Sequence, residues 1–73
     1  MPNLTTRVAL IGAGYISDWH IAALRRVPGI ELAAICDVSE TAARALADRA
    51  GVASVFTSVE ALVDSKAVDC VHI

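Results

Sequence analysis

The 73-residue sequence has few aromatic residues, two cysteines and no cluster of basic residues. A net charge of −2 offers no electrostatic footprint for DNA or RNA, so we expect no nucleic-acid partner. The N-terminus has no basic region ahead of a long apolar stretch, and no apolar run approaches the roughly 20 residues of a membrane span. These absences predict a cytoplasmic protein without signal peptide or membrane segment.

The two cysteines, Cys36 and Cys70, both lie in apolar, strand-like surroundings. Without a secretory signal, two free buried thiols are expected rather than a disulfide, and no residues have metal-ligand spacing. Hydrophobic residues make up 56% of the chain. Such a composition in so short a chain suggests part of a larger protein that covers its apolar faces.

Apolar periodicity and turn residues predict alternating strands and helices. The predicted strands are 7–11, 30–37 and 68–73, and the predicted helices are 15–27, 40–50 and a short one ending near residue 64. Ser39 is expected to cap the second helix, Gly51 to end it, and a capping box from Thr57 to Glu60 to open the third. The second helix is expected to bury Ala43, Leu46, Ala47 and Ala50, and the first to bury Ile16, Ala23, Leu24 and Val27.

This alternation predicts an α/β fold, a three-layer Rossmann-like parallel sheet. The expected unit is a βαβαβ half-domain with strand order 3-2-1 and a short extra helix. With 68–73 as the third strand, strand 7–11 would be an unpaired, unprotected edge. We therefore expect a homodimer or small homo-oligomer joined through that strand or by exchange of an element.

A glycine-rich turn, GAGYIS, follows the first strand and opens the first helix. Gly12 would allow the tight turn, and Gly14 would let the backbone approach a pyrophosphate, which the helix N-terminus also attracts. Tyr15 and Ile16 would contribute backbone contacts at the helix start. Ser17 stands where a third glycine or alanine is usual, a position that serves helix–strand packing. A turn without a ligand is the competing interpretation.

Asp37 ends the second strand twenty residues beyond Ser17, where an acid can bind the adenosine ribose of NAD. A turn or cap aspartate is the alternative. A carboxylate there repels the 2′-phosphate of NADP, and the nearest arginine, Arg44, lies more than a turn into the following helix. The predicted cofactor is therefore NAD, with NADP disfavoured.

The order of motifs resembles the N-terminal domain of the Gfo/Idh/MocA oxidoreductases. Besides the glycine turn, the matching residues are His20, Leu24, Pro28, Glu31 and Leu32, and the similarity extends through the final segment to Ile73. Ser17 is the chief departure. His20 itself shares the apolar side of the first helix, and a hydrogen-bonded core histidine is favoured over a catalytic base.

The resemblance implies an NAD(P)-dependent oxidoreductase acting by hydride transfer on a sugar, cyclitol or related polyol. Of the family's functional residues, Gly12, Gly14 and Asp37 carry over. The family's E-K-P lysine motif and T-P segment do not occur in this sequence. Residues 1–73 are thus expected to be the N-terminal part of a dinucleotide-binding domain, with the substrate domain absent and no catalysis by this chain alone. A ligand-free assembly module and an NAD sensor without reductase activity remain alternatives.

Overall fold

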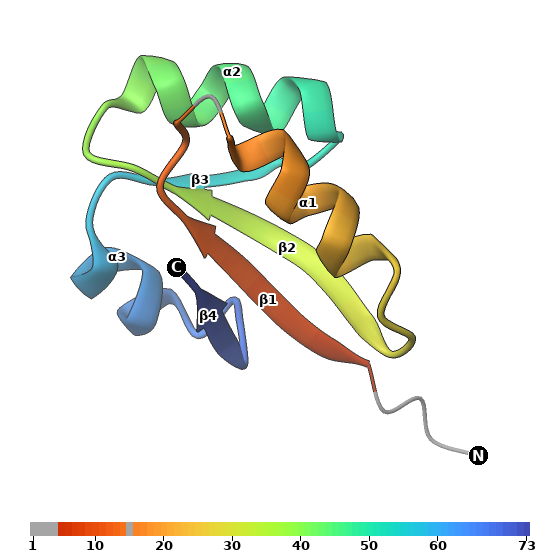
Figure 1. Cartoon of the computed structure of the whole chain (residues 1–73). Coiled ribbons are helices and arrows are strands. Elements are labelled where there is room, and N and C mark those ends of the chain that lie inside the picture. The colour runs from red at the N-terminus through yellow and green to blue at the C-terminus, as the bar shows by residue number, and fades with distance from the viewer. Residues whose placement is uncertain (1–4, 15) are drawn as a thin grey trace.

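Four parallel strands form one sheet in the order β3-β2-β1-β4 in the computed structural model, which describes residues 5–14 and 16–73. The strands are β1 (Thr6–Ile11), β2 (Ile30–Cys36), β3 (Ser54–Phe56) and β4 (Cys70–His72), and the helices are α1 (Ser17–Arg25), α2 (Glu40–Ala50) and α3 (Val59–Ser65). Helices α1 and α2 cover one face of the sheet and α3 the other (Figure 1). The predicted three-layer α/β fold is confirmed.

Alternation along the two central strands divides the core between these faces. Leu10 and Ile35 pack in the cluster with Leu46 on the α1 and α2 side. Their neighbours Ala9 and Ala34 pack with Leu62 of α3 on the other side. Because successive strand residues point to opposite faces, continuous apolar runs such as those of β1 and β2 suit strands covered on both sides.

The order 3-2-1 is confirmed, but the identity of the third strand was predicted wrongly. The third strand is Ser54–Phe56, which pairs with β2 and which sequence periodicity did not reveal. The predicted third strand contains β4, which pairs with β1 through Val8–Cys70, Ala9–Val71 and Leu10–His72. Strand β1 therefore lies between two neighbours, and the expected unprotected edge at residues 7–11 is wrong.

Helix α2 follows its prediction closely. The Ser39 side chain accepts from Ala42 N–H, Gly51 at the far end has φ of 72°, and the four residues expected to be buried are buried. In α3 the cap is Ser58 rather than Thr57, because its side chain accepts from Ala61 N–H at 3.1 Å. One residue of offset in a capping motif is common when two hydroxyl residues are adjacent.

The buried side of α1 differs from the prediction. Ser17 and Ile21 are its buried residues, whereas Ile16 and Val27 are 50% and 46% exposed. Ala23 is exposed too. The helix buries Ser17 against the glycine turn, where its Oγ donates to the Gly12 carbonyl, and part of the predicted apolar stripe faces solvent. The prediction for Cys70 is also wrong: both cysteines are free, but Cys70 is exposed on the outer strand β4 while Cys36 is buried.

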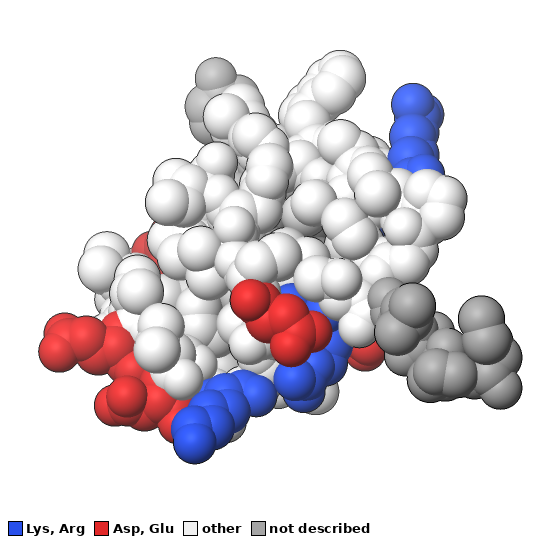
Figure 2. All heavy atoms as spheres, turned by 90° about the horizontal axis from the view of Figure 1, so that it is seen from below, with Lys and Arg blue, Asp and Glu red and all other residues white. Residues whose placement is uncertain are grey.

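Helix α3 and strand β4 carry exposed apolar side chains, and Figure 2 shows the molecule from below the view of Figure 1. Acidic and basic side chains gather in the lower part of this view, and the upper part is mostly uncharged. Large apolar side chains exposed on these two elements or just beyond them are Val59, Val63, Val71 and Ile73. An uncovered apolar surface of this kind is typical of a contact surface.

Candidate nucleotide-binding site

The glycine turn begins where β1 ends and is tied to the neighbouring strand. Gly12 has φ of 100°, a left-handed conformation that an L side chain rarely adopts. Its N–H donates to the Cys36 carbonyl at 2.8 Å, which continues the β1–β2 pairing beyond the last strand residue. The predicted role of Gly12 as the residue that permits the tight turn is consistent with this geometry.

Asp37 lies against the glycine turn, so the two predicted binding elements meet at one edge of the sheet. Its Oδ2 accepts from Ala13 N–H at 2.8 Å, and its Oδ1 accepts from Ser39 N–H at 2.8 Å. These N–H groups, Ser39 first and Ala13 second, hold the pKa of Asp37 below its ordinary value of 3.8. The carboxylate is therefore ionised at neutral pH and fixed in orientation. The sequence did not reveal its bond to the turn.

Asp37 also affects the buried thiol beside it. Burial raises the pKa of Cys36, and the Asp37 carboxylate raises it further. The thiol therefore stays protonated at neutral pH and adds no charge to the site.

Ser17 replaces the third glycine without loosening the packing that this position serves. Its side chain is 3% exposed. Its Oγ donates to the Gly12 carbonyl at 3.0 Å, and its backbone N–H donates to the Gly14 carbonyl at 2.9 Å. The serine thus bonds the start of α1 to both ends of the G-A-G turn.

Open space lies on the outer side of Gly14. A Cβ built on this residue would meet no atom within 4 Å. A cavity of about 180 Å³ adjoins it and is lined by Gly12, Gly14, Ile16, Ser17, His20 and residues of β1 and Ile73. Within the described part of the chain, no carbonyl accepts from the Gly14 N–H. Ile16, the N-cap of α1, borders this cavity, and Tyr15, the other residue predicted to make backbone contacts there, lies outside the described residues.

These residues fit a dinucleotide. The space at Gly14 would be filled by a side chain, as expected where a backbone must approach a pyrophosphate closely. Each oxygen of Asp37 accepts one backbone hydrogen bond. Because a carboxylate has about four lone-pair positions, capacity remains for the two ribose hydroxyls.

His20 is neither a fully buried core residue nor isolated. It is half-buried at the wall of the cavity, and its Nδ1 lies 3.1 Å from Nε2 of His72 on β4. The two rings have centroids 5.1 Å apart and are tilted by 58°. The expectation of a hydrogen-bonded histidine is met, but its partner was not foreseen, because β4 was expected on the far side of β2.

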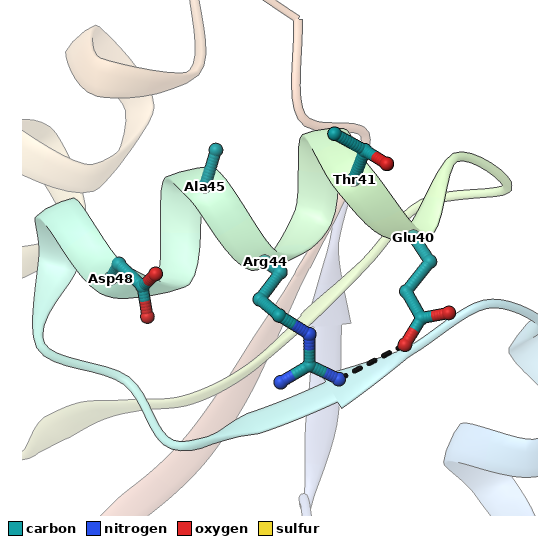
Figure 3. A pocket seen from close by; sticks show the side chains of 5 residues that line it. All are labelled: Glu40, Thr41, Arg44, Ala45 and Asp48. Atoms are coloured by element: carbon teal, nitrogen blue, oxygen red, sulfur yellow. Dashed lines mark hydrogen bonds and ion pairs between the residues drawn. The ribbon is translucent and has the colours of Figure 1, made fainter.

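Arg44 is not placed to bind a phosphate group, because its guanidinium is already paired. Its guanidinium pairs with Glu40 one turn earlier on α2 at 3.0 Å (Figure 3). Both residues line a separate hollow of about 370 Å³ together with Thr41, Ala45 and Asp48. All five come from one helix and no second element contributes a group, so this hollow is a weak candidate for a ligand site.

Neither a metal site nor a membrane-spanning helix is found in the part of the chain that the structure describes. Residues 5–14 and 16–73 contain no group of three or more His, Cys, Asp or Glu side chains that could hold a metal ion. Among their helices, none combines the length and the apolar character that crossing a membrane requires.

A parallel sheet with a glycine turn after β1 and an ionised acid at the end of β2 defines a Rossmann-type dinucleotide-binding unit. The chain belongs to the Gfo/Idh/MocA oxidoreductase family: the family's NAD-binding Rossmann fold matches residues 6–73. The predicted family, fold and cofactor class are thereby confirmed.

Individual relatives agree with this assignment. The chain is 32% identical over 65 residues to the D-apiose dehydrogenase of Paraburkholderia graminis. The aligned region is 89% of this chain and 17% of that enzyme. Among solved structures it resembles an oxidoreductase from Agrobacterium radiobacter in complex with NAD+, L-tartaric acid and magnesium. That likeness has a TM-score of 0.82 and 29% identity, over 90% of this chain and 19% of the other.

It also resembles the WlbA dehydrogenase from Bordetella pertussis in complex with NADH and UDP-GlcNAcA. Here the TM-score is 0.82 and the identity 28%, over 97% of this chain and 20% of the other. The chain thus spans about a fifth of the length of these relatives.

Proposed function

We propose that this chain binds the adenosine and pyrophosphate parts of NAD through Gly12, Gly14, Tyr15, Ile16 and Asp37. The observation that carries the proposal is the 2.8 Å hydrogen bond from Ala13 N–H to Asp37 Oδ2. It joins the turn suited to phosphate and the acid suited to ribose at the carboxyl edge of the sheet, where Rossmann-type folds bind ligands.

We further propose that the chain is the N-terminal part of the cofactor domain of an oxidoreductase acting on a sugar, a cyclitol or a related polyol. Support comes from the family and from a relative named for a sugar, D-apiose. When bound, the nicotinamide supplies the hydride chemistry, and the residues described above hold and orient the dinucleotide. Substrate-binding and catalytic groups belong to the rest of the protein, and this chain alone is expected to be inactive.

NAD is preferred over NADP in this proposal. The ionised Asp37 carboxylate would repel a 2′-phosphate, and Arg44 is paired with Glu40 rather than free to compensate. A cytoplasmic location is also proposed, on the ground that Cys36 and Cys70 are both free thiols.

The decisive experiment is NAD titration of the unmodified chain and of the Gly14→Val variant by calorimetry. A Cβ at this position meets no atom within 4 Å, so the fold is expected to persist, while the side chain blocks the approach of phosphate. Affinity should fall by at least about tenfold, the loss expected when hydrogen bonds to a charged group are removed.

Ala61→Val is the matched control, because it adds a valine at an exposed position of α3 away from the turn. It should leave NAD affinity unchanged. Circular dichroism checks that both variants fold. If Gly14→Val binds NAD as well as the unmodified chain, the glycine turn is not the site. If the unmodified chain binds no NAD, the proposed binding function is wrong and the alternative of a ligand-free assembly module is favoured.

We also propose that the chain forms a homodimer or small homo-oligomer. The support comes from β4, which is an edge strand of the sheet among the described residues and carries the exposed Val71. An outer strand with unpaired backbone groups on one side can pair with a second copy, and a two-fold pairing closes without forming a fibre.

A further inference from the structure

The hydrogen bond between His20 and His72 connects α1 to β4 across 52 residues of sequence. His20 lies three residues after α1 begins at Ser17, and it lines the cavity together with Gly14 and Ser17. Its Nδ1 is engaged by His72, so the ring nitrogen left for a ligand is Nε2. The use of that nitrogen depends on which ring carries the shared proton.

A neutral imidazole has one donor and one acceptor nitrogen. If His20 Nδ1–H donates to His72, then His20 Nε2 is a lone pair that would repel a phosphate oxygen. If His72 Nε2–H donates, then His20 Nδ1 accepts and its Nε2 carries a proton. Only the second arrangement offers a donor to an anionic ligand beside the glycine turn.

We propose that His72 donates to His20 and so fixes the tautomer in which His20 Nε2–H donates to a pyrophosphate oxygen of the dinucleotide. His20 is then a cofactor-binding residue, and His72 is a positioning residue that acts through it. The inference rests on the proposed function. It adds a side-chain donor, on the first turn of α1, to the backbone groups of the glycine turn. The protonation state of that donor is set by His72 on β4, at the other end of the sequence.

Two isosteric substitutions of His20 separate binding from packing. In His20→Asn the amide oxygen can take the place of Nδ1 and accept from His72 Nε2–H, while the donor toward the cavity is lost. In His20→Gln the amide replaces Nε2, which keeps a donor toward the cavity but breaks the bond to His72. We expect His20→Asn to weaken binding of both NAD and ADP roughly tenfold, and His20→Gln to weaken it less.

At position 72, His72→Leu should weaken NAD and ADP binding as His20→Asn does, and His72→Gln should restore it, because the glutamine amide lies near the place of Nε2 and can donate. If the two histidines serve packing alone, the NAD affinity of each variant should fall in proportion to its unfolding temperature instead. NAD affinity that is unchanged in His20→Asn, or that tracks only the unfolding temperature, overturns the inference.

A second measurement needs no variant to fold. Long-range proton–nitrogen NMR spectra of the histidine rings report the tautomer, and we expect His20 with its proton on Nε2 and a shift of that nitrogen on adding NAD. A proton on Nδ1 of His20 overturns the inference. If NAD binds and Gly14→Val abolishes binding while the histidine tests fail, only this inference fails. If the unmodified chain binds no NAD, the proposed function fails with it.

Discussion

Asp37 shows how one side chain serves both the fold and the site. Its two oxygens accept the N–H groups of Ala13 and Ser39, so the acid proposed to bind the ribose also holds the turn proposed to bind the phosphates. A plain cap aspartate would make the second bond but not the first. Damage at Asp37 should therefore affect the whole dinucleotide site, not the ribose contact alone.

Replacing Asp37 with serine should change the choice of cofactor. Removing the carboxylate removes the repulsion toward a 2′-phosphate, so the preference for NAD over NADP should narrow or reverse. NAD affinity should also fall, since the serine cannot reach Ala13 N–H as the longer side chain does. Parallel calorimetric titrations with the two dinucleotides measure both effects. Equal affinities of the unmodified chain for NAD and NADP would contradict this role of Asp37.

At the scale of elements, the serine at the start of α1 bonds helix to turn. Ser17→Ala removes the hydrogen bond from Oγ to the Gly12 carbonyl at a site that is 3% exposed. We expect the free energy of unfolding to fall by about 1 kcal/mol, the usual net worth of such a bond. Urea denaturation measures it. Thr41→Ala, at an exposed position of α2, is the control and should change stability by less than about 0.5 kcal/mol.

Strand β4 is short, and an ion pair at its start holds it to β1. Asp69 accepts from Arg7 N–H at 2.8 Å and pairs with the Arg7 guanidinium at 3.2 Å, while its own N–H donates to the Arg7 carbonyl. The Arg7 N–H first, and then the Arg7 side chain, hold the pKa of Asp69 below its ordinary value of 3.8. The bond therefore stabilises the folded state only while Asp69 is ionised.

The consequence is a loss of stability in acid. Because the pKa values of Asp69 and Asp37 are both lowered on folding, their stabilisation is complete above 3.8 and is lost as the pH falls below it through the folded values. Unfolding temperature measured against pH should fall in that range, and Asp69→Asn should flatten part of the fall. Glu60→Gln, at an exposed residue of α3, is the control. An equally steep fall in Asp69→Asn would contradict the assignment.

At the scale of the whole molecule, the outer strand β4 and the exposed apolar side chains near it predict self-association. Light scattering of the purified chain should give the mass of a dimer or small oligomer. Val71→Lys places a charge on β4, where Val71 is 42% exposed, and should shift the mass toward the monomer. Ala45→Lys, at an exposed position of α2 on the opposite face of the sheet from α3, tests whether any added charge has this effect. A monomer at tens of micromolar for the unmodified chain would refute the proposal.

Local chemistry made much of the site predictable. Gly12, Gly14 and Asp37 could be proposed because turn geometry, phosphate approach and strand ends impose residue types at fixed spacings, and the structure brings the turn and Asp37 together. The caps of α2 and its buried stripe followed for the same reason: each depends on residues within a few positions of one another. The position of α1 was harder, since which side it buries depends on the packing of Ser17 against the turn.

The sequence by itself determined the parallel α/β class, the glycine turn, the acid at the end of β2 and the choice of NAD, because these depend on short-range patterns. Only the tertiary structure decided that Ser54–Phe56 takes the third place and β4 lies beside β1. Ser54–Phe56, with three residues, carries too little periodicity to be assigned, and the neighbours of a strand are chosen by long-range pairing. That choice alone brought His72 to His20 and Asp69 to Arg7.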